Sequence, residues 1–251
     1  MNSSDDRLIV TLSVVCFLLL SGCRKEQGNG NSDPISETLA SEVPVAQPEA
    51  ITPPVVEGVA PEQVFATVCA ACHGMKGEGN LALHSPSIAG LPSWYVLEQI
   101  GKFRNGFRGS NPQDIPGIQM QAISLSLTGE QLQSAALAVE KLPSTPTRII
   151  KEGDNDRGRE MFAQTCMPCH RFNGQGEQAF HSAPLVTLNP EYLRRQLQNY
   201  AKGWRGSAEQ DFYGHKMVQV STGLSDRDVT DLVRFIGELA HGDDPRKAMH
   251  W

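Results

Sequence analysis

The 251-residue sequence lacks the features of several common functional classes. It contains no run of basic residues, and its formal net charge of -6 comes from charges of both signs spread along the chain, so we expect no nucleic-acid partner. Apart from one short N-terminal stretch it has no long apolar run, and we expect the remainder to be soluble. No convincing alternation of polar and apolar residues indicates a β-strand, and the sequence favours an all-α fold.

The sequence also has no cysteine left over for a disulfide. Two of its six cysteines lie near the N-terminus, and the other four form two copies of Cys-x-x-Cys-His, at residues 69–73 and 166–170. This pentapeptide is the attachment signature of a c-type haem. We therefore predict two covalently bound haem c groups, attached through Cys69, Cys72, Cys166 and Cys169.

The histidines that complete the two motifs are His73 and His170. The two thiols of a motif add across the vinyl groups of one porphyrin, and the turn of chain between them and the histidine places the imidazole under the metal. The imidazole then supplies one axial ligand of the iron. The function therefore depends on what occupies the opposite face of each iron.

The N-terminus carries an almost wholly apolar stretch of 13 residues, 8–20, followed by Ser-Gly and Cys23. This length is typical of a signal-peptide core rather than of a membrane span. The ending resembles a bacterial lipobox, so we predict a lipoprotein signal over residues 1–22 and a lipid on Cys23. An ordinary cleaved signal with an incidental cysteine is the alternative. Bacterial haem attachment occurs outside the cytoplasmic membrane, so the predicted location is the periplasm, with a lipid anchor in a membrane.

Residues 23–58 differ in composition from the rest of the chain. Prolines mix there with Gly, Ser and Glu, and apolar residues are sparse. Such a segment cannot bury enough apolar surface to offset its chain entropy, so we predict a disordered tether. A flexible chain of this length has an end-to-end distance on the order of 30 Å.

The remainder is an internal repeat with an offset of 97 residues and no gap. The matched positions include Phe65 with Phe162, Gly77 with Gly174, Tyr95 with Tyr192, Gln99 with Gln196, Arg108 with Arg205, and Met120 with Met217. We therefore predict two tandem domains of one fold, residues 59–147 (half one) and residues 151–243 (half two). Each is small for a free-standing core, but a buried haem would supply much of the apolar centre.

Three helices are expected in each half, with Gly- and Pro-rich loops between them. They cover residues 61–71, 94–103 and 128–142, and residues 156–165, 191–200 and 229–239. Thr128 with Gln131 three residues later forms a capping-box pattern, and Asn189 followed by Pro190 predicts an N-cap and a first helical position. The last helix of each half has an apolar stripe at helical period. These stripes are Leu132, Ala135, Ala136, Val139 and Leu142, and Val229, Leu232, Val233, Ile236 and Leu239.

Two methionines are candidates for the second axial ligand. Met120 follows His73 by 47 residues, and Met217 follows His170 by the same distance. A thioether opposite an imidazole raises the reduction potential of a haem and suits electron transfer. Methionine is otherwise a filler of hydrophobic cores, but no other methionine pair recurs in the repeat.

Histidines outside the motifs are weaker candidates. His84 and His181 recur in the repeat, only 11 residues after each motif histidine, and we leave axial ligation open as an alternative for them. His215 lies two residues before Met217 but has no histidine counterpart in half one, which favours a core or surface role.

Arg108 and Arg205 recur in Gly-Phe-Arg-Gly and Gly-Trp-Arg-Gly. A guanidinium matches carboxylate geometry, and each haem carries two propionates. We expect these arginines to contact a propionate or to pair across the domain interface, with a solvated surface arginine as the alternative. The nearby aromatic residues are expected to pack in the haem pockets and at the interface.

Both halves resemble class I cytochrome c domains, and the tandem pair resembles the dihaem cytochrome c4 family. Five segments of half one carry the resemblance, and half two repeats them more loosely. These segments are Cys69–His73, Ser87–Leu91, Trp94–Ile100, Asn105–Gly109 and Gly117–Met120. The resemblance covers about residues 59 to 240. It implies two domains packed face to face with pseudo-twofold symmetry, propionates near the interface, and electron passage between the haems.

The predicted function is single-electron transfer between respiratory partners. With both irons six-coordinate there would be no substrate site, so we do not expect an enzyme. The expected donor is a quinol-oxidising complex or a dehydrogenase, and the expected acceptor is a terminal oxidase or reductase. The alternatives are an obligate cytochrome subunit of a larger oxidoreductase, or a dihaem peroxidase or thiosulfate-oxidising enzyme with one open or unusually ligated haem.

Overall fold

The computed structural model describes residues 56–248. The predicted signal, Cys23 and most of the predicted tether lie outside these residues. Val56 belongs to the predicted tether, but its amide donates a hydrogen bond to the carbonyl of Ser126 at 2.8 Å. The ordered chain therefore begins before residue 59, where the sequence analysis placed the start of half one. Within residues 56–248 no helix is long and apolar enough to cross a membrane.

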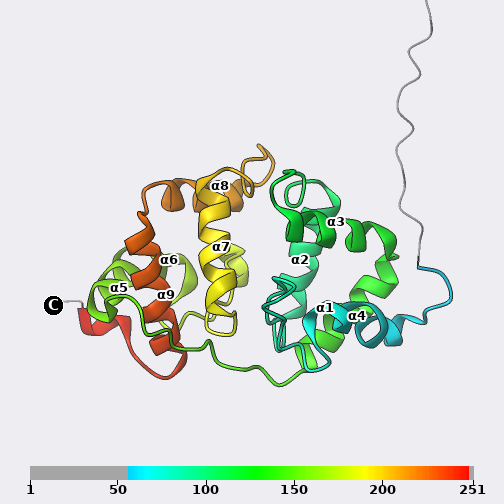
Figure 1. Ribbon diagram of the computed structural model, residues 1–251, viewed down its shortest axis with the longest axis horizontal. Helices are drawn as coiled ribbons and strands as arrows, with labels where there is room; N and C mark the ends of the chain where they lie inside the picture. The colour runs from blue at the N-terminus through cyan, green and yellow to red at the C-terminus, as the bar shows by residue number, and fades with distance from the viewer. Residues whose placement is uncertain (1–55, 249–251) are drawn as a thin grey trace, which may run out of the picture. The chain divides into compact units, whose positions relative to one another are not determined.

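Both halves are helical, and the described chain contains no β-strand, only two isolated bridges, Asn80–Ser85 and Glu177–Ser182. Half one contains η1 (Pro61–Gln63), η2 (Phe65–Cys69), α1 (Ala70–His73), α2 (Ser93–Arg104), α3 (Ile115–Ser126) and α4 (Gly129–Lys141). Half two contains α5 (Asn155–Met161), η3 (Phe162–Cys166), α6 (Met167–His170), η4 (Gln178–Phe180), α7 (Pro190–Ala201), α8 (Phe212–Thr222) and α9 (Asp226–Ala240), and η5 (Pro245–Ala248) follows. Figure 1 shows α2 of half one and α7 of half two as the two helices nearest the junction between the halves.

The last helix of each half forms for the reason that the sequence suggested. At α4, Thr128 and Gln131 make a complete capping box, each side chain bonding the other residue's amide, at 3.2 and 2.9 Å. Ser225 and Asp228 make the same box at α9. The predicted apolar stripes are buried in both helices, except that Leu142 lies just after the end of α4 and is half-buried.

The sequence analysis was wrong about the loops between these helices. It assigned loop to the two segments that carry Met120 and Met217, and both are helices, α3 and α8. Each begins at an aspartate whose side chain accepts the amide hydrogen three residues later, Asp114 from Gly117 and Asp211 from Gly214. Such an aspartate is a good N-cap, and that signal was available in the sequence.

Asn189 also differs from its prediction. It stands at the N-cap position of α7, but its side chain makes no capping bond. The side-chain oxygen instead accepts the amide of Ser87 in half one, at 3.2 Å. Pro190 does occupy the first turn, as predicted. The contact with the other half therefore replaces the local cap.

The connection between the halves runs along half two. Thr147 is buried, its amide donates to the carbonyl of Val186 at 2.8 Å, and its hydroxyl contacts the carbonyl oxygens of Leu185 and Leu188. Helix α2 packs on α3 and α4, and α7 packs on α8 and α9. In each half this arrangement leaves a cavity between the haem motif and the methionine-bearing helix.

Candidate haem sites

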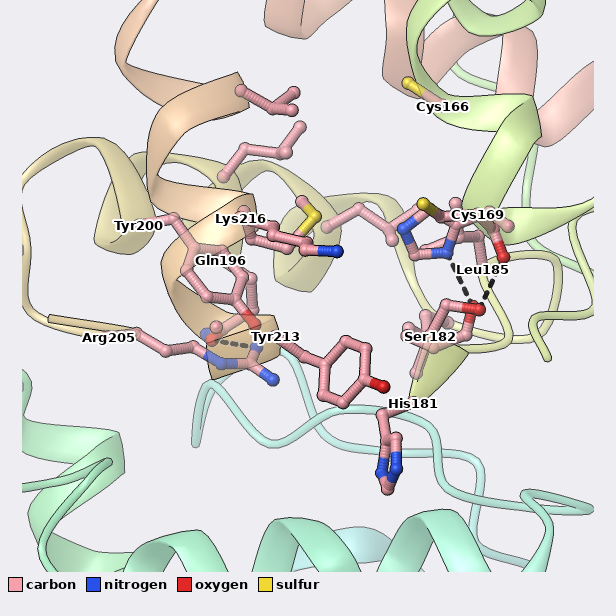
Figure 2. Close-up of a pocket in the computed structure, with 18 of the residues that line it drawn as sticks. Cys166, Cys169, His181, Ser182, Leu185, Gln196, Tyr200, Arg205, Tyr213 and Lys216 are labelled. Carbon is pink, nitrogen blue, oxygen red and sulfur yellow. Dashed lines mark hydrogen bonds between the residues drawn. The ribbon is translucent and has the colours of Figure 1, made fainter. Parts of the chain in front are cut away.

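Each half contains one apolar cavity, and the predicted ligands line it. Cys69, Cys72, His73 and Met120 line the cavity of half one, and Cys166, Cys169, His170 and Met217 line that of half two. The two cavities are almost equal in volume, about 1270 and 1260 Å³ including the space open to solvent. Figure 2 shows the half-two cavity, with Cys166 and Cys169 on one side and Tyr200 and Arg205 on the other.

Both motif histidines have Nδ1 within hydrogen-bond distance of a backbone carbonyl. Nδ1 of His73 lies 2.9 Å from the carbonyl oxygen of Pro86, and Nδ1 of His170 lies 2.9 Å from that of Ala183. A carbonyl can only accept, so Nδ1 carries the proton and Nε2 keeps its lone pair for a metal. Burial lowers the pKa of both imidazoles, which favours the neutral form that binds metals.

The four motif cysteines are free thiols rather than disulfide partners. Burial raises the pKa of Cys69 to about 11 and that of Cys166 to about 12, so both thiols stay protonated near neutral pH. Neither is therefore suited to act as a reactive thiolate. Two thiols and one Nε2 lining an apolar cavity instead fit a covalently attached haem in each half.

The methionine-bearing helices are fixed by close contact with the Gly-x-Arg-Gly loops. A Cβ added to Gly109 would lie 2.3 Å from the carbonyl oxygen of Gly117 in α3, and one added to Gly206 would lie 2.5 Å from that of Gly214 in α8. Only glycine permits so close an approach. The repeated glycines thereby set the position of the helix that presents each methionine to its cavity.

Arg108 and Arg205 join the two halves. Arg108 donates to the side-chain oxygens of Gln99 at 2.9 Å and Gln196 at 3.2 Å, and also to the hydroxyl of Tyr192 at 3.1 Å. Arg205 donates to Gln196 at 2.8 Å and to Gln99 at 2.7 Å. Each glutamine thus accepts from the arginine of its own half and from that of the other half. We call these four residues the Arg–Gln bridge.

The Arg–Gln bridge is buried, with Arg108 only 6% and Arg205 only 5% exposed. The alternative of a solvated surface arginine is therefore wrong, and the prediction of an interface role agrees with the structure. Within residues 56–248 these hydrogen-bond partners are all neutral, although a buried guanidinium ordinarily requires a counter-charge. Arg108 lines the cavity of half one and Arg205 that of half two, where the propionates of a haem would supply that charge.

His84 and His181 lie in exposed loops and adopt the left-handed conformation, with φ of 55° and 50°. The His181 ring stacks on Tyr213, and its Nδ1 lies 2.7 Å from Glu98 of half one. The backbone carbonyl of His84 accepts a hydrogen bond from Arg195 of half two. Both contacts cross between the halves, a role that sequence reasoning did not identify, although that of His84 is made by its backbone. His84 also lines the cavity of half one, and His181 that of half two.

A family model for cytochrome c matches residues 60–134 and 155–240, one match in each half. The thiosulfate dehydrogenase electron acceptor of Stutzerimonas stutzeri (strain A1501) is 28% identical over 184 residues, which cover 69% of this chain and 80% of that protein. The structure of reduced cytochrome c4 from Pseudomonas stutzeri aligns with a TM-score of 0.57 at 24% identity, over 70% of this chain and 95% of that one. The structure of the thiosulfate dehydrogenase TsdBA from Marichromatium purpuratum aligns with a TM-score of 0.57 at 26% identity, over 70% of this chain but only 39% of that chain.

These similarities confirm the all-α fold, the two cytochrome c domains and the two covalently bound haem c groups. When bound, each haem supplies an iron that takes up and releases a single electron. The protein supplies attachment, orientation and the electrostatic surroundings of that iron.

Proposed function

This chain belongs to the cytochrome c family and carries electrons on two haem c groups, and we propose that both irons are six-coordinate. The proposed ligand pairs are His73 with Met120 and His170 with Met217. The observation that supports them is that each pair lines one cavity, with the histidine Nε2 left free by its Nδ1 hydrogen bond. A filled sixth position leaves no place for oxygen or peroxide and suits a carrier.

The ligand pairs are tested by spectroscopy of the ferric, haem-loaded protein. We expect two low-spin haems, the weak absorbance band of an iron–thioether bond, and no rapid binding of cyanide. A high-spin haem that binds cyanide readily would contradict this assignment and would favour an enzyme.

We further propose that the propionates of the two haems contact Arg108 and Arg205. Both propionate contacts would then lie at the same buried bridge between the halves, which would suit electron exchange between the haems. Replacing Arg108 or Arg205 with Leu removes one guanidinium and leaves its propionate buried without a partner. We expect a lower reduction potential for that haem, because the propionate charge is then uncompensated.

The chain is proposed to act in the periplasm, held at a membrane by a lipid on Cys23. This rests on the lipobox-like sequence and on the export that haem attachment requires. Expression of a Cys23→Ala variant in a Gram-negative host tests it. We expect the wild-type protein in the membrane fraction and the variant in the released periplasmic fraction. Equal release of both proteins would exclude the anchor.

Its partners are redox proteins, and we propose a dehydrogenase as the donor and a terminal oxidase or reductase as the acceptor. The likeness to a thiosulfate dehydrogenase electron acceptor supports a donor of that kind. Stopped-flow mixing of the ferric protein with a thiosulfate dehydrogenase and thiosulfate should reduce both haems, whereas thiosulfate alone should not. Reduction by thiosulfate alone would instead indicate an enzyme.

One observation supports the alternative that this chain is an obligate subunit of a larger oxidoreductase. The matched part of TsdBA is only part of a longer chain. Size-exclusion chromatography after detergent extraction distinguishes the two cases. A carrier elutes alone, and a subunit co-elutes with stoichiometric partners.

A further inference from the structure

The two haem sites differ in charge at a few matched positions, two of which lie in the helices at the interface. The repeat matches Glu98 in α2 with Arg195 in α7, and Lys102 with Asn199. Two further charges near the cavities are repeated in both halves, Arg108 with Arg205 and Asp114 with Asp211. The repeated charges cancel in a comparison of the two sites, so the electrostatic difference comes mainly from the exchanged positions.

Arg195 of half two faces the site of half one. It lines the half-one cavity, and its Nη2 donates to the carbonyl of His84 at 2.6 Å. The side chain is half-buried, and its Nε has no hydrogen-bond partner in the described part of the chain. Burial lowers the pKa of Arg195, which indicates that water screens its charge incompletely. Within residues 56–248 Arg195 forms no ion pair, although the carboxylate of Asp114 acts on it without direct contact. Half one therefore has a positive charge at this position that no ion pair in the described chain offsets.

Glu98 of half one contacts two residues that line the cavity of half two, Lys102 and His181. Its carboxylate pairs with Lys102 at 3.0 Å and lies 2.7 Å from Nδ1 of His181. Lys102 is also 3.0 Å from Asp211, so two carboxylates offset its single charge. Lys102 and His181 line the half-two cavity. The exchanged positions therefore contribute no net positive charge to half two when His181 is neutral.

One exposed charge has to be weighed against this difference. Lys216 lines the half-two cavity, and its counterpart in half one is the neutral Gln119. Lys216 is exposed, with its ammonium 4.6 Å from the ring centre of Phe212. Water and salt screen an exposed charge much more strongly than a half-buried one. We therefore expect Arg195 to have the larger effect.

We propose that Arg195 and Glu98 separate the two reduction potentials and make the haem of half one the more easily reduced. This rests on the proposed His/Met carrier. A nearby positive charge stabilises the reduced iron, which carries one positive charge fewer, and a nearby carboxylate has the opposite effect. In the protein that holds one electron, that electron then resides mainly in half one.

The test is a potentiometric titration of the haem-loaded protein at pH 8. A Met120→His variant shows which of the two one-electron transitions belongs to which haem, because it lowers the reduction potential of the half-one haem only. Arg195→Gln should lower the half-one potential and leave the half-two potential in place. Glu98→Gln should raise the half-two potential. Each change should alter the equilibrium constant between the haems by roughly tenfold, which is about 59 mV for one electron.

Two further variants separate charge from structure. Arg195→Lys keeps the charge and should restore most of the wild-type potential, which a merely structural role would not predict. Lys216→Gln is the matched control, and its shift should be smaller than those of the two interface variants. A half-one haem with the lower potential, or interface shifts no larger than that of Lys216→Gln, would overturn the proposal. The iron–thioether band is read in the same samples, and its absence would reject the proposed carrier rather than this inference alone.

Discussion

In both halves, the third residue of the last helix holds the N-terminal segment of that half in place, but the interaction differs between them. The third residue of the last helix is Gln131 in half one and Asp228 in half two. Besides capping its helix, Gln131 donates to the carbonyl oxygens of Val56 and Val59, at 3.2 and 2.9 Å. Asp228 instead forms an ion pair with Arg157 of α5.

The crossing of the first and last helices differs as well. In half two, Gly158 of α5 touches α9 so closely that an added Cβ would lie 2.1 Å from the carbonyl oxygen of Asp231. Phe162 and Phe235 pack beside this crossing, with ring centres 5.4 Å apart. The matching position in half one is Pro61, in the short η1. The residues proposed as haem ligands are thus repeated, whereas the contacts between the first and last helices of each half have diverged.

The largest expected effect tests whether the two sites are equivalent in ligation. Met120→Ala and Met217→Ala each remove one thioether and open one iron. We expect each variant to lose about half of the iron–thioether absorbance and to bind one cyanide per chain. If only one of the two variants changed the spectrum, the halves would differ in ligation and one methionine would be core packing.

The next largest effect tests the helix crossing of half two. Gly158→Ala forces a methyl group against α9, and we expect a loss of about 1–3 kcal/mol in unfolding free energy. Gly101→Ala is the control, since nothing lies within 4 Å of its added Cβ in the middle of α2. That substitution should stabilise by up to about 1 kcal/mol. Denaturant titration followed by circular dichroism measures both, and equal effects would argue against the close crossing.

A smaller effect is expected at Gln131 in half one. Gln131→Ala removes half of the capping box and the two bonds to the N-terminal segment. We expect a loss of about 1–2 kcal/mol. Hydrogen exchange should rise in peptides covering residues 56–64 and α4, and stay unchanged in α9. Increased exchange confined to half two would contradict the assignment.

The smallest effect is a difference in how the stability of the two halves depends on pH, because Asp228 can lose its charge and Gln131 has none. Hydrogen bonds from Ser225, together with Arg157, lower the pKa of Asp228 from 3.8 to about 2. A lowered pKa means that the ionised form stabilises the fold, fully above about pH 4 and progressively less as the pH falls to 2. Asp228→Asn should therefore melt at a lower temperature than wild type at pH 6, and the gap should close by pH 2.

Gln131→Ala provides the contrast, because Gln131 does not titrate. Its melting-temperature gap to wild type should be the same at pH 6 and pH 2. Two results would contradict the structure: a melting-temperature difference that disappears at low pH for Gln131→Ala, or one that stays constant for Asp228→Asn. Either would show that the Asp228 interaction does not depend on charge in the way that distinguishes it from the Gln131 hydrogen bonds.

The sequence was sufficient for the features that are local or repeated. The haem motifs follow from residue type and spacing, and the capping box at Thr128 and the apolar stripes follow from helix geometry. The pairing of Met120 with Met217 came from the repeat, and the structure places each one at a cavity.

The contacts between the halves could not be read in this way. The repeat matched Gln99 with Gln196, but a match does not reveal that each glutamine accepts from both arginines. Asn189 is a residue type that favours the N-cap position, yet its side chain accepts a hydrogen bond from the amide of Ser87 in the other half instead. Such contacts depend on how two folded domains meet, and a single sequence carries no periodic signal for that. The helices α3 and α8 were missed for a simpler reason, because their glycines and proline were taken as loop signals.

The central claim is that each iron is bound by one histidine nitrogen and one methionine sulfur, in the same way in both halves. Iron K-edge absorption spectroscopy of the ferric, haem-loaded protein tests it most directly, because it reports the atoms bound to iron. The account predicts one sulfur neighbour per iron, averaged over the two sites. Half a sulfur per iron, or none, would show that at least one iron is open or bound by another ligand, and would contradict the account.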